Sequence, residues 1–192
     1  TLLLTFSFLW VTYIGSTLGE NYLAINTILI QFIFVSAFFL DAYAFSTEGI
    51  IGFTIGRKNK KNFLKVVKNS IQLSFFTALL ISLLYLLFFK NLINLLTNIE
   101  ILRFISYKHA LWVILIPPIA SFCYQLDGIF LGATQTKEIR NAMIISVASF
   151  ILLSIYLTKI FDNHGLWLSL LIFMVLRSMT LNFYFSRILK KF

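Results

Sequence analysis

The sequence predicts an all-α protein, a polytopic transmembrane bundle of six helices. Apolar residues make up 59% of the 192 residues, and only 12% are charged, about half the share in a soluble globular domain. Six long apolar stretches are separated by short polar or basic segments. A soluble fold of this size could not cover so much apolar surface with so few polar side chains, whereas lipid can.

The apolar stretches have the length of membrane-spanning helices. A bilayer core about 30 Å thick needs roughly 20 apolar residues per helix. Lipid offers no partners for backbone polar groups, which favours helices over open sheet. The alternation of barrel strands does not occur in this sequence. We therefore expect a single transmembrane lobe with spans at about 1–16, 23–55, 69–89, 109–133, 142–160 and 166–187.

Three stretches carry further expectations. The second, 23–55, is longer than a straight span needs, so it should tilt or extend beyond the membrane. The fourth contains Pro117 and Pro118, which remove two backbone donors and predict a break or kink, either static or bending during transport. The segment 91–108 leaves two alternatives open, a short amphipathic helix in the interface or a plain loop.

The loops alternate in charge, which predicts the orientation. The formal net charge is +9, and most basic residues flank apolar stretches, so we interpret them as topology determinants rather than a nucleic-acid site. The positive-inside rule places the more basic side in the cytoplasm, with both ends of this chain there, in the cell inner (plasma) membrane. That side carries Arg57, Lys58, Lys60, Lys61, Lys65, Lys68, Lys137, Arg140, Arg187, Lys190 and Lys191; the other carries Lys90, Arg103, Lys108 and Lys159.

Four charged residues lie inside the predicted spans: Asp41, Glu48, Asp127 and Arg177. Charges at such depth are costly and mark function by default. Asp41 and Glu48 are two helical turns apart and share one face. A carboxylate in a low dielectric can exchange a proton or bind a cation, which suits ion-coupled transport. In the alternative interpretation, Arg177 pairs permanently with one acid and only locks the bundle.

Glycines four residues apart follow two of these acids. The pairs are Gly52/Gly56 after Glu48 and Gly128/Gly132 after Asp127. Small residues at this spacing allow helices to approach closely. We interpret both pairs first as packing and second as a seam that moves.

Soluble-enzyme chemistry and cofactor binding find no support in the sequence. His109 and His164 are expected in external loops without metal-site spacing, and the single Cys123 lies in an apolar run. The sequence contains no P-loop, so an ion gradient, H⁺ or Na⁺, is the remaining simple energy source.

Two stretches carry a family resemblance, LDAYAFSTEGIIGFTIGRKNKK (40–61) and LDGIFLGATQTKEIRNAMIIS (126–146), and 163–181 fits the same pattern. They resemble the DinF-like branch of the multidrug and toxin extrusion (MATE) transporters. The resemblance implies two six-helix lobes around a central cavity. The chain begins at Thr1 inside an apolar run. We therefore expect a fragment that corresponds to the second lobe, with the N-terminal lobe missing.

The resemblance implies a cation-coupled antiporter, driven by Na⁺ or H⁺, that exports drugs or other amphiphilic small molecules by alternating access. Its partners would be the lipid bilayer, the small-molecule substrate and the missing lobe, with no nucleic acid. Asp127 matches a cation-binding acid of the tenth helix, Glu48 a glutamate of the eighth and Arg177 an arginine of the twelfth. Residues 1–15 contain no acid, whereas another branch has a glutamate there. The branch's proton-linked aspartate belongs to the first helix, outside this chain.

Two alternatives remain. A lipid-linked oligosaccharide flippase of the same superfamily usually has more than one intramembrane arginine, and this chain offers only Arg177. A membrane-embedded enzyme should cluster His, Asp and Glu near an interface, whereas here the acids are spread over two predicted helices. A non-transporting scaffold belongs to the same second alternative.

Overall fold

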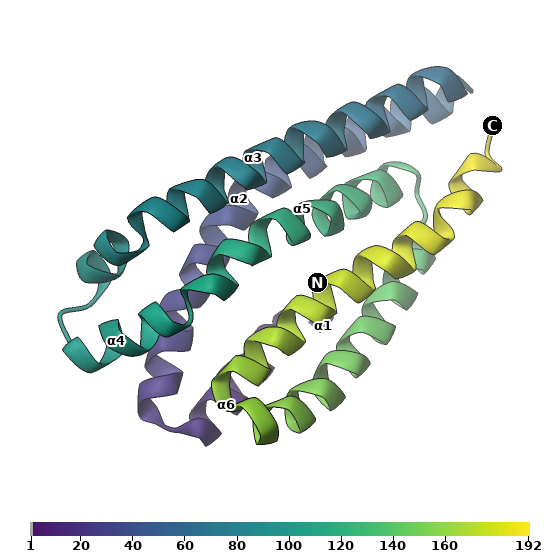
Figure 1. Cartoon of the computed structure of the whole chain (residues 1–192). Helices are drawn as coiled ribbons and strands as arrows, with labels where there is room; N and C mark the ends of the chain where they lie inside the picture. The colour runs from purple at the N-terminus through teal and green to yellow at the C-terminus, as the bar shows by residue number, and fades with distance from the viewer. Residues whose placement is uncertain (1) are drawn as a thin grey trace.

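The computed structural model describes residues 2–192, and helices account for nearly all of them (Figure 1). No strand occurs in this part of the chain, and α2, α3, α5 and α6 are long and apolar enough to cross a bilayer. The predicted all-α membrane helix bundle is therefore confirmed; Thr1, the first residue of the first predicted span, lies outside the described residues. The helices are α1 (Leu2–Leu18), α2 (Glu20–Gly56), α3 (Lys60–Leu96), α4 (Glu100–Lys108), α5 (Ala110–Gly132) and α6 (Thr136–Leu189).

The longest helix, α6, is a hairpin. Its 54 residues would extend about 80 Å if straight, but the chain reverses at Asp162, where φ is 49° and ψ is −134° (Figure 1). Gly165 sits just after the reversal, and a Cβ there would collide with the backbone of Leu157 and Thr158. The two halves of α6 contain the ranges predicted as the fifth and sixth spans.

The structure corrects the sequence interpretation of the basic segment after α2. Residues 60–68 were expected in a loop, but α3 already begins at Lys60. The Asn59 side chain caps this helix by accepting a hydrogen bond from the backbone N–H of Asn62, 3.0 Å away. Phe63 is fully buried and its ring lies 5.1 Å from that of Phe192. The Asn59 cap and the buried Phe63 therefore favour a helix here, although the segment is rich in lysine.

The segment after α3 combines the two alternatives left open. The helix α3 continues to Leu96, and the separate nine-residue helix α4 follows, with Phe104 exposed. Arg103 closes the end of α3, because its guanidinium donates to the carbonyl oxygens of Thr97 (2.8 Å) and Asn94 (3.1 Å). These hydrogen bonds satisfy carbonyl groups at the end of α3 and tie α4 to it.

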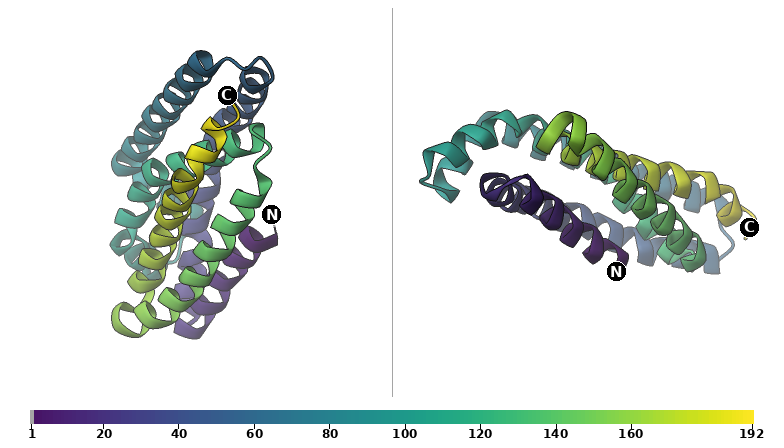
Figure 2. Two further views of the ribbon diagram at one scale, coloured as in Figure 1. Left: turned by 90° about the vertical axis from the view of Figure 1, so that its right-hand side faces the viewer. Right: turned by 90° about the horizontal axis from the view of Figure 1, so that it is seen from below.

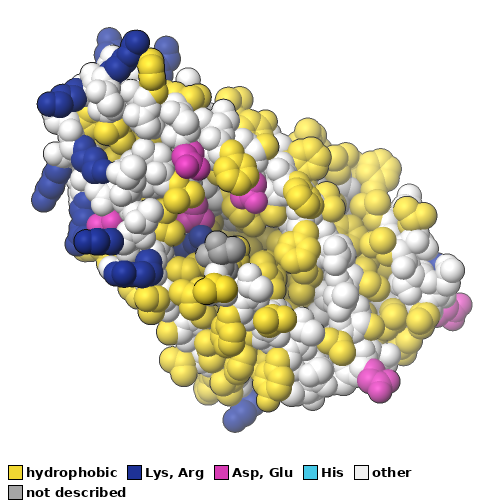
Figure 3. Space-filling view, turned by 180° about the vertical axis from the view of Figure 1, so that it is seen from behind, with side chains coloured by type: hydrophobic (Ala, Val, Ile, Leu, Met, Phe, Trp, Pro, Cys, Tyr) yellow, Lys and Arg dark blue, Asp and Glu magenta, His cyan; other side chains and the backbone are white. Residues whose placement is uncertain are grey.

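The helices run side by side, with α5 packed against α2, α3 and α6, and α1 packed against α2 and α6. The loops after α2 and α5 and the C-terminus lie together at one end (Figures 1 and 2). Lysine and arginine side chains crowd this end of the surface (Figure 3). We name it the basic end; the other end, which holds α4 and the reversal of α6, is the opposite end.

Candidate functional site

One of the predicted intramembrane charges pairs directly with another. Arg177, from the second half of α6, places its Nη2 2.6 Å from Oδ2 of Asp127 in α5. The two side chains are only 11% and 15% exposed. The pair therefore joins two helices that are adjacent in the bundle, at a distance typical of a strong charge-assisted hydrogen bond.

This ion pair leaves hydrogen-bonding capacity unused. Asp127 Oδ1 and Arg177 Nε are both buried and have no hydrogen-bond partner. Buried polar atoms are nearly always satisfied in proteins, so two unsatisfied atoms in one pair need an explanation. Glu138 Oε2, in the second ion pair of the described residues, is unsatisfied as well, so the Asp127–Arg177 pair is distinguished by its place between two apolar helices, where charges are costly.

The other two predicted acids differ from each other. Asp41 in α2 is half-buried and interacts electrostatically with both Arg177 and Asp127. Glu48 forms no ion pair in residues 2–192, and its backbone carbonyl lies against Gly132. The structure thus brings together three of the four charges and leaves Glu48 on the neighbouring helix seam.

The seam between α2 and α5 is packed backbone against backbone. A Cβ on Gly128 would lie 2.9 Å from the carbonyl carbon of Ala44, and one on Gly132 would lie 3.0 Å from that of Glu48. Real side-chain carbons do not approach so closely, so only glycine fits at either position. The close contact predicted for the Gly128/Gly132 pair is confirmed.

The glycine pair on α2 behaves differently. A Cβ on Gly52 would reach only the carbonyl oxygen of Gly132, at an ordinary 3.5 Å, and Gly49 and Gly56 have open space around them. The prediction that the Gly52/Gly56 pair also lies in a close helix contact is therefore wrong for Gly56. In this seam the close contact is made by the glycines of α5 and the backbone of α2.

A side-chain hydrogen bond also crosses the α2–α5 seam. The hydroxyl of Thr47 lies 2.7 Å from the carbonyl oxygen of Tyr43 in its own helix and 3.0 Å from the side-chain amide of Gln125 in α5. Gln125 is fully buried, two residues before Asp127. Its amide therefore links α5 to α2 next to the ion pair.

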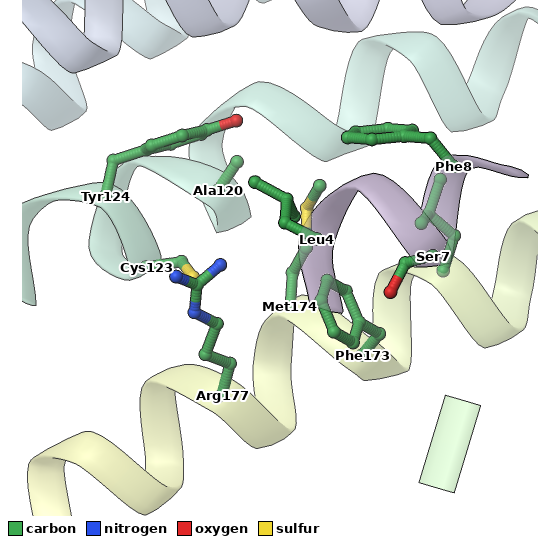
Figure 4. A pocket seen from close by; sticks show the side chains of 10 residues that line it. Leu4, Ser7, Phe8, Ala120, Cys123, Tyr124, Phe173, Met174 and Arg177 are labelled. Carbon is green, nitrogen blue, oxygen red and sulfur yellow. The ribbon is translucent and has the colours of Figure 1, made fainter. Parts of the chain in front are cut away.

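Space is distributed unevenly around Arg177. Where the guanidinium faces Cys123 and Tyr124 of α5 and Leu4 of α1, the cavity measures only about 10 Å³, room for at most one water molecule (Figure 4). Toward the basic end, a cleft of about 450 Å³ is bounded by α1, the end of α5 and the start of α6. Arg177 lines both spaces, and Arg140 lines the larger one.

The predicted double proline does not break α5. The helix runs through Pro117 and Pro118 without interruption. A proline at 118 cannot donate to the carbonyl four residues earlier, Ile114, and the hydroxyl of Ser82 in α3 donates to that oxygen instead, at 2.7 Å. A neighbouring helix thus satisfies a freed carbonyl, as membrane bundles require. The kink itself stays a prediction.

A polar cluster at the opposite end was missed by the sequence analysis. Asn26 of α2 and Asn163 of α6 exchange two side-chain hydrogen bonds, at 2.7 and 2.9 Å, and the Trp167 indole N–H donates to Asn26 Oδ1 at 2.9 Å. All three residues are about 1% exposed. The only sequence signal is an asparagine near the end of each of two apolar stretches, which does not reveal that the two meet.

The sequence also placed His109 wrongly. It was expected in an external loop, but the junction of α4 and α5 buries it to 2% exposure. Its ring stacks on that of His164, with centroids 4.2 Å apart. Nowhere in residues 2–192 do three or more His, Cys, Asp or Glu side chains gather as a metal site would require.

Comparison with known proteins identifies the family. A profile of the MatE family matches residues 1–160. The chain belongs to this family. It is also similar to the DNA damage-inducible protein F of Escherichia coli (strain K12), with 34% identity over 181 residues that cover 94% of this chain. The chain spans 39% of the length of that relative.

Membership agrees with the resemblance drawn from the LDGIFLGAT region. The matched residues contain Asp41, Glu48 and Asp127, whereas Arg177 lies beyond residue 160 but within a chain that the relative covers almost completely. The protein is thus a MatE-family membrane protein with a buried Asp127–Arg177 pair beside a cleft.

Proposed function

We propose that this chain forms one lobe of a secondary active transporter that exchanges H⁺ or Na⁺ for drugs or other amphiphilic small molecules by alternating access. Family membership supports the transporter class. The single observation that supports ion coupling is the buried Asp127–Arg177 pair with unused hydrogen-bonding atoms. A second six-helix lobe of the same polypeptide would complete the central cavity.

The coupling step follows from the chemistry of the pair. A proton or a cation on Asp127 neutralises its charge and removes the partner of Arg177. Because the pair ties α5 to the second half of α6, its loss frees these helices to separate next to the existing cleft. A buried guanidinium without a partner is costly, so occupancy of Asp127 is linked to a change in helix packing.

The orientation is part of the proposal. The basic end would lie in the cytoplasm, in accordance with the positive-inside rule, and the opposite end outside the cell. The cleft beside Arg177 is lined by residues of α5 and α6 that lie near the basic end, and we propose that substrate enters it from the cytoplasm. Export then requires that the cleft close on this side as the other side opens.

The test uses the full-length protein in proteoliposomes, with ethidium movement driven by an imposed pH or Na⁺ gradient. Asp127→Asn keeps an oxygen that can accept from Arg177 but removes the exchangeable charge, so gradient-driven transport should be abolished while folded yield is retained. Glu138→Gln is a matched control, because Glu138 holds the other ion pair of the described residues, with Arg187 at the basic end. That variant should transport at the wild-type rate.

Normal gradient-driven transport by Asp127→Asn would remove Asp127 from the coupling step. Wild-type protein that moves a lipid-linked oligosaccharide but not ethidium would replace drug export with the flippase alternative. The two results are separable, since the first depends on the variant and the second on the substrate.

A further inference from the structure

Two imidazole rings meet at the opposite end, at the other end of α5 from the Asp127–Arg177 pair. His109 lies between α4 and α5, and His164 follows the reversal of α6 (Figure 1). The rings stack with an interplanar angle of 6°. His109 is buried and His164 is exposed, so His164 covers His109 from the solvent side.

Hydrogen bonds fix where each ring carries its proton. His109 Nδ1 lies 2.9 Å from the carbonyl oxygen of Ile105, which can only accept, so Nδ1 is protonated, and burial without an acceptor at Nε2 favours the neutral ring with Nε2 bare. That Nε2 has no hydrogen-bond partner. The Trp112 indole N–H donates to His164 Nδ1 at 2.9 Å, so His164 is bare at Nδ1 and protonated at Nε2. Each ring is neutral, and neither bare nitrogen can take a proton without disturbing the contact.

No carboxylate in residues 2–192 forms an ion pair with either imidazole ring. The titratable groups that face His109 are Tyr22 from α2, Lys108 from α4 and His164 from α6. Two acids lie in the same region: Glu20 lines a surface cleft with Tyr22 and Ile105, which both contact His109, and Asp162 is exposed two residues before His164. Burial, with smaller contributions from His164 and Lys108, lowers the pKa of His109 below its ordinary value.

We propose that His109 and His164 form a proton-binding site that is filled only when the α4–α5 junction separates from the reversal of α6. A proton on His164 Nδ1 displaces the Trp112 hydrogen bond. A proton on His109 Nε2 creates a buried cation with no acceptor, stacked on a second ring. The closed contact is therefore the unprotonated state, and proton uptake favours the separated state.

The pH dependence follows from this linkage. Once separated, the His109 ring regains an ordinary imidazole pKa of about 6.5, so the open state binds more protons than the closed state. The closed contact is stable above that pH and is lost as the pH falls below it. The site goes beyond the proposed transport function, because it acts at the other end of the bundle and requires neither substrate nor gradient.

The test is backbone amide hydrogen–deuterium exchange of the full-length protein in detergent, read by mass spectrometry on peptides covering residues 105–112 and 160–168. Measured rates are divided by the intrinsic exchange rate of an unprotected amide at each pH. Between pH 6.5 and 5.5, exchange in these peptides should rise by up to about tenfold for each linked proton. Peptides from the middle of α3 should not change.

The variants isolate the two rings. The double variant His109→Gln/His164→Gln cannot titrate and should show no rise, while the amide oxygen introduced by His164→Gln can still accept from Trp112. Lys159→Gln, a change in charge at the same end, should respond as the wild type does. If the double variant does not fold, His164→Gln alone, at an exposed position, should show a shallower rise. Wild-type exchange that is independent of pH, or an undiminished rise in either folded histidine variant, overturns the proposal, whereas neither result affects the Asp127 assignment.

Discussion

The two faces of α5 are built on different principles. The face toward α2 is a glycine seam, Gly128 and Gly132 against the backbone of Ala44 and Glu48, with no space for a single added carbon. The face toward α6 and α1 holds a buried ion pair with unsatisfied atoms and borders a cleft of about 450 Å³. Asp127 and Gly128 are adjacent in the sequence, yet Asp127 lies in the ion pair and Gly128 in the close-packed seam.

The difference predicts that the two faces of α5 resist displacement unequally. Close-packed interfaces resist small displacements, because any shift loses many contacts at once. An ion pair next to open space can break and re-form at lower cost, provided that a proton, cation or substrate replaces the lost partner. The α2–α5 seam is therefore expected to resist displacement more than the contact between α5 and α6 at the ion pair.

The largest expected effect concerns the ion pair. Arg177→Gln leaves the Asp127 carboxylate buried without a partner, which should lower the free energy of unfolding by about 3–5 kcal/mol. The measurement is denaturant unfolding or folded yield of the full-length protein in detergent. The variant should lose stability rather than merely change substrate preference.

The double variant Asp127→Asn/Arg177→Gln sharpens this result. Two neutral amides have no uncompensated charge, so the double variant should be more stable than Arg177→Gln alone. If the changes in unfolding free energy of the two single variants simply add, the two charges are not coupled in the folded protein. The face of α5 toward α6 would then not depend on the ion pair.

A smaller effect is expected in the seam. Gly128→Ala drives a methyl group into the backbone of Ala44, which cannot move aside as a flexible side chain would, so unfolding should become easier by about 1–3 kcal/mol. Gly49→Ala is the matched control on the other helix, because its surroundings are open and alanine favours helix there. Equal thermal stability of the two variants would show that the seam is looser than the structure indicates.

Much of this contrast was readable in the sequence. Apolar length predicted the membrane bundle, the four intramembrane charges were identified, and the spacing of Gly128 and Gly132 predicted a close helix contact. These features are local: a charge in an apolar run or a glycine every four residues is visible without knowing which helix lies opposite. The choice of Asp127 as the acid that pairs with Arg177 was not visible, because it depends on which faces of α5 and α6 meet.

Features that join distant segments were missed for the same reason. Asn26 and Asn163 are 137 positions apart and form two hydrogen bonds. His109 is buried where the junction of α4 and α5 packs against His164. The start of α3 was misjudged because a run of lysines obscured one cap and one buried aromatic, Asn59 and Phe63. Composition describes the average environment of a segment, whereas caps and single buried rings decide where a helix begins.

The smallest expected effect tests how α5 tolerates its prolines above the seam. Ser82→Ala removes the hydroxyl that satisfies the carbonyl of Ile114, and hydrogen bonds between membrane helices contribute about 0.6 kcal/mol on average. Ser70→Ala on the same helix is the control, because its hydroxyl bonds to the carbonyl of Val67 within α3. Thermal unfolding in detergent should distinguish the two, with Ser82→Ala the less stable. If they match, the hydroxyl of Ser82 contributes nothing measurable to the stability of α5 at its prolines.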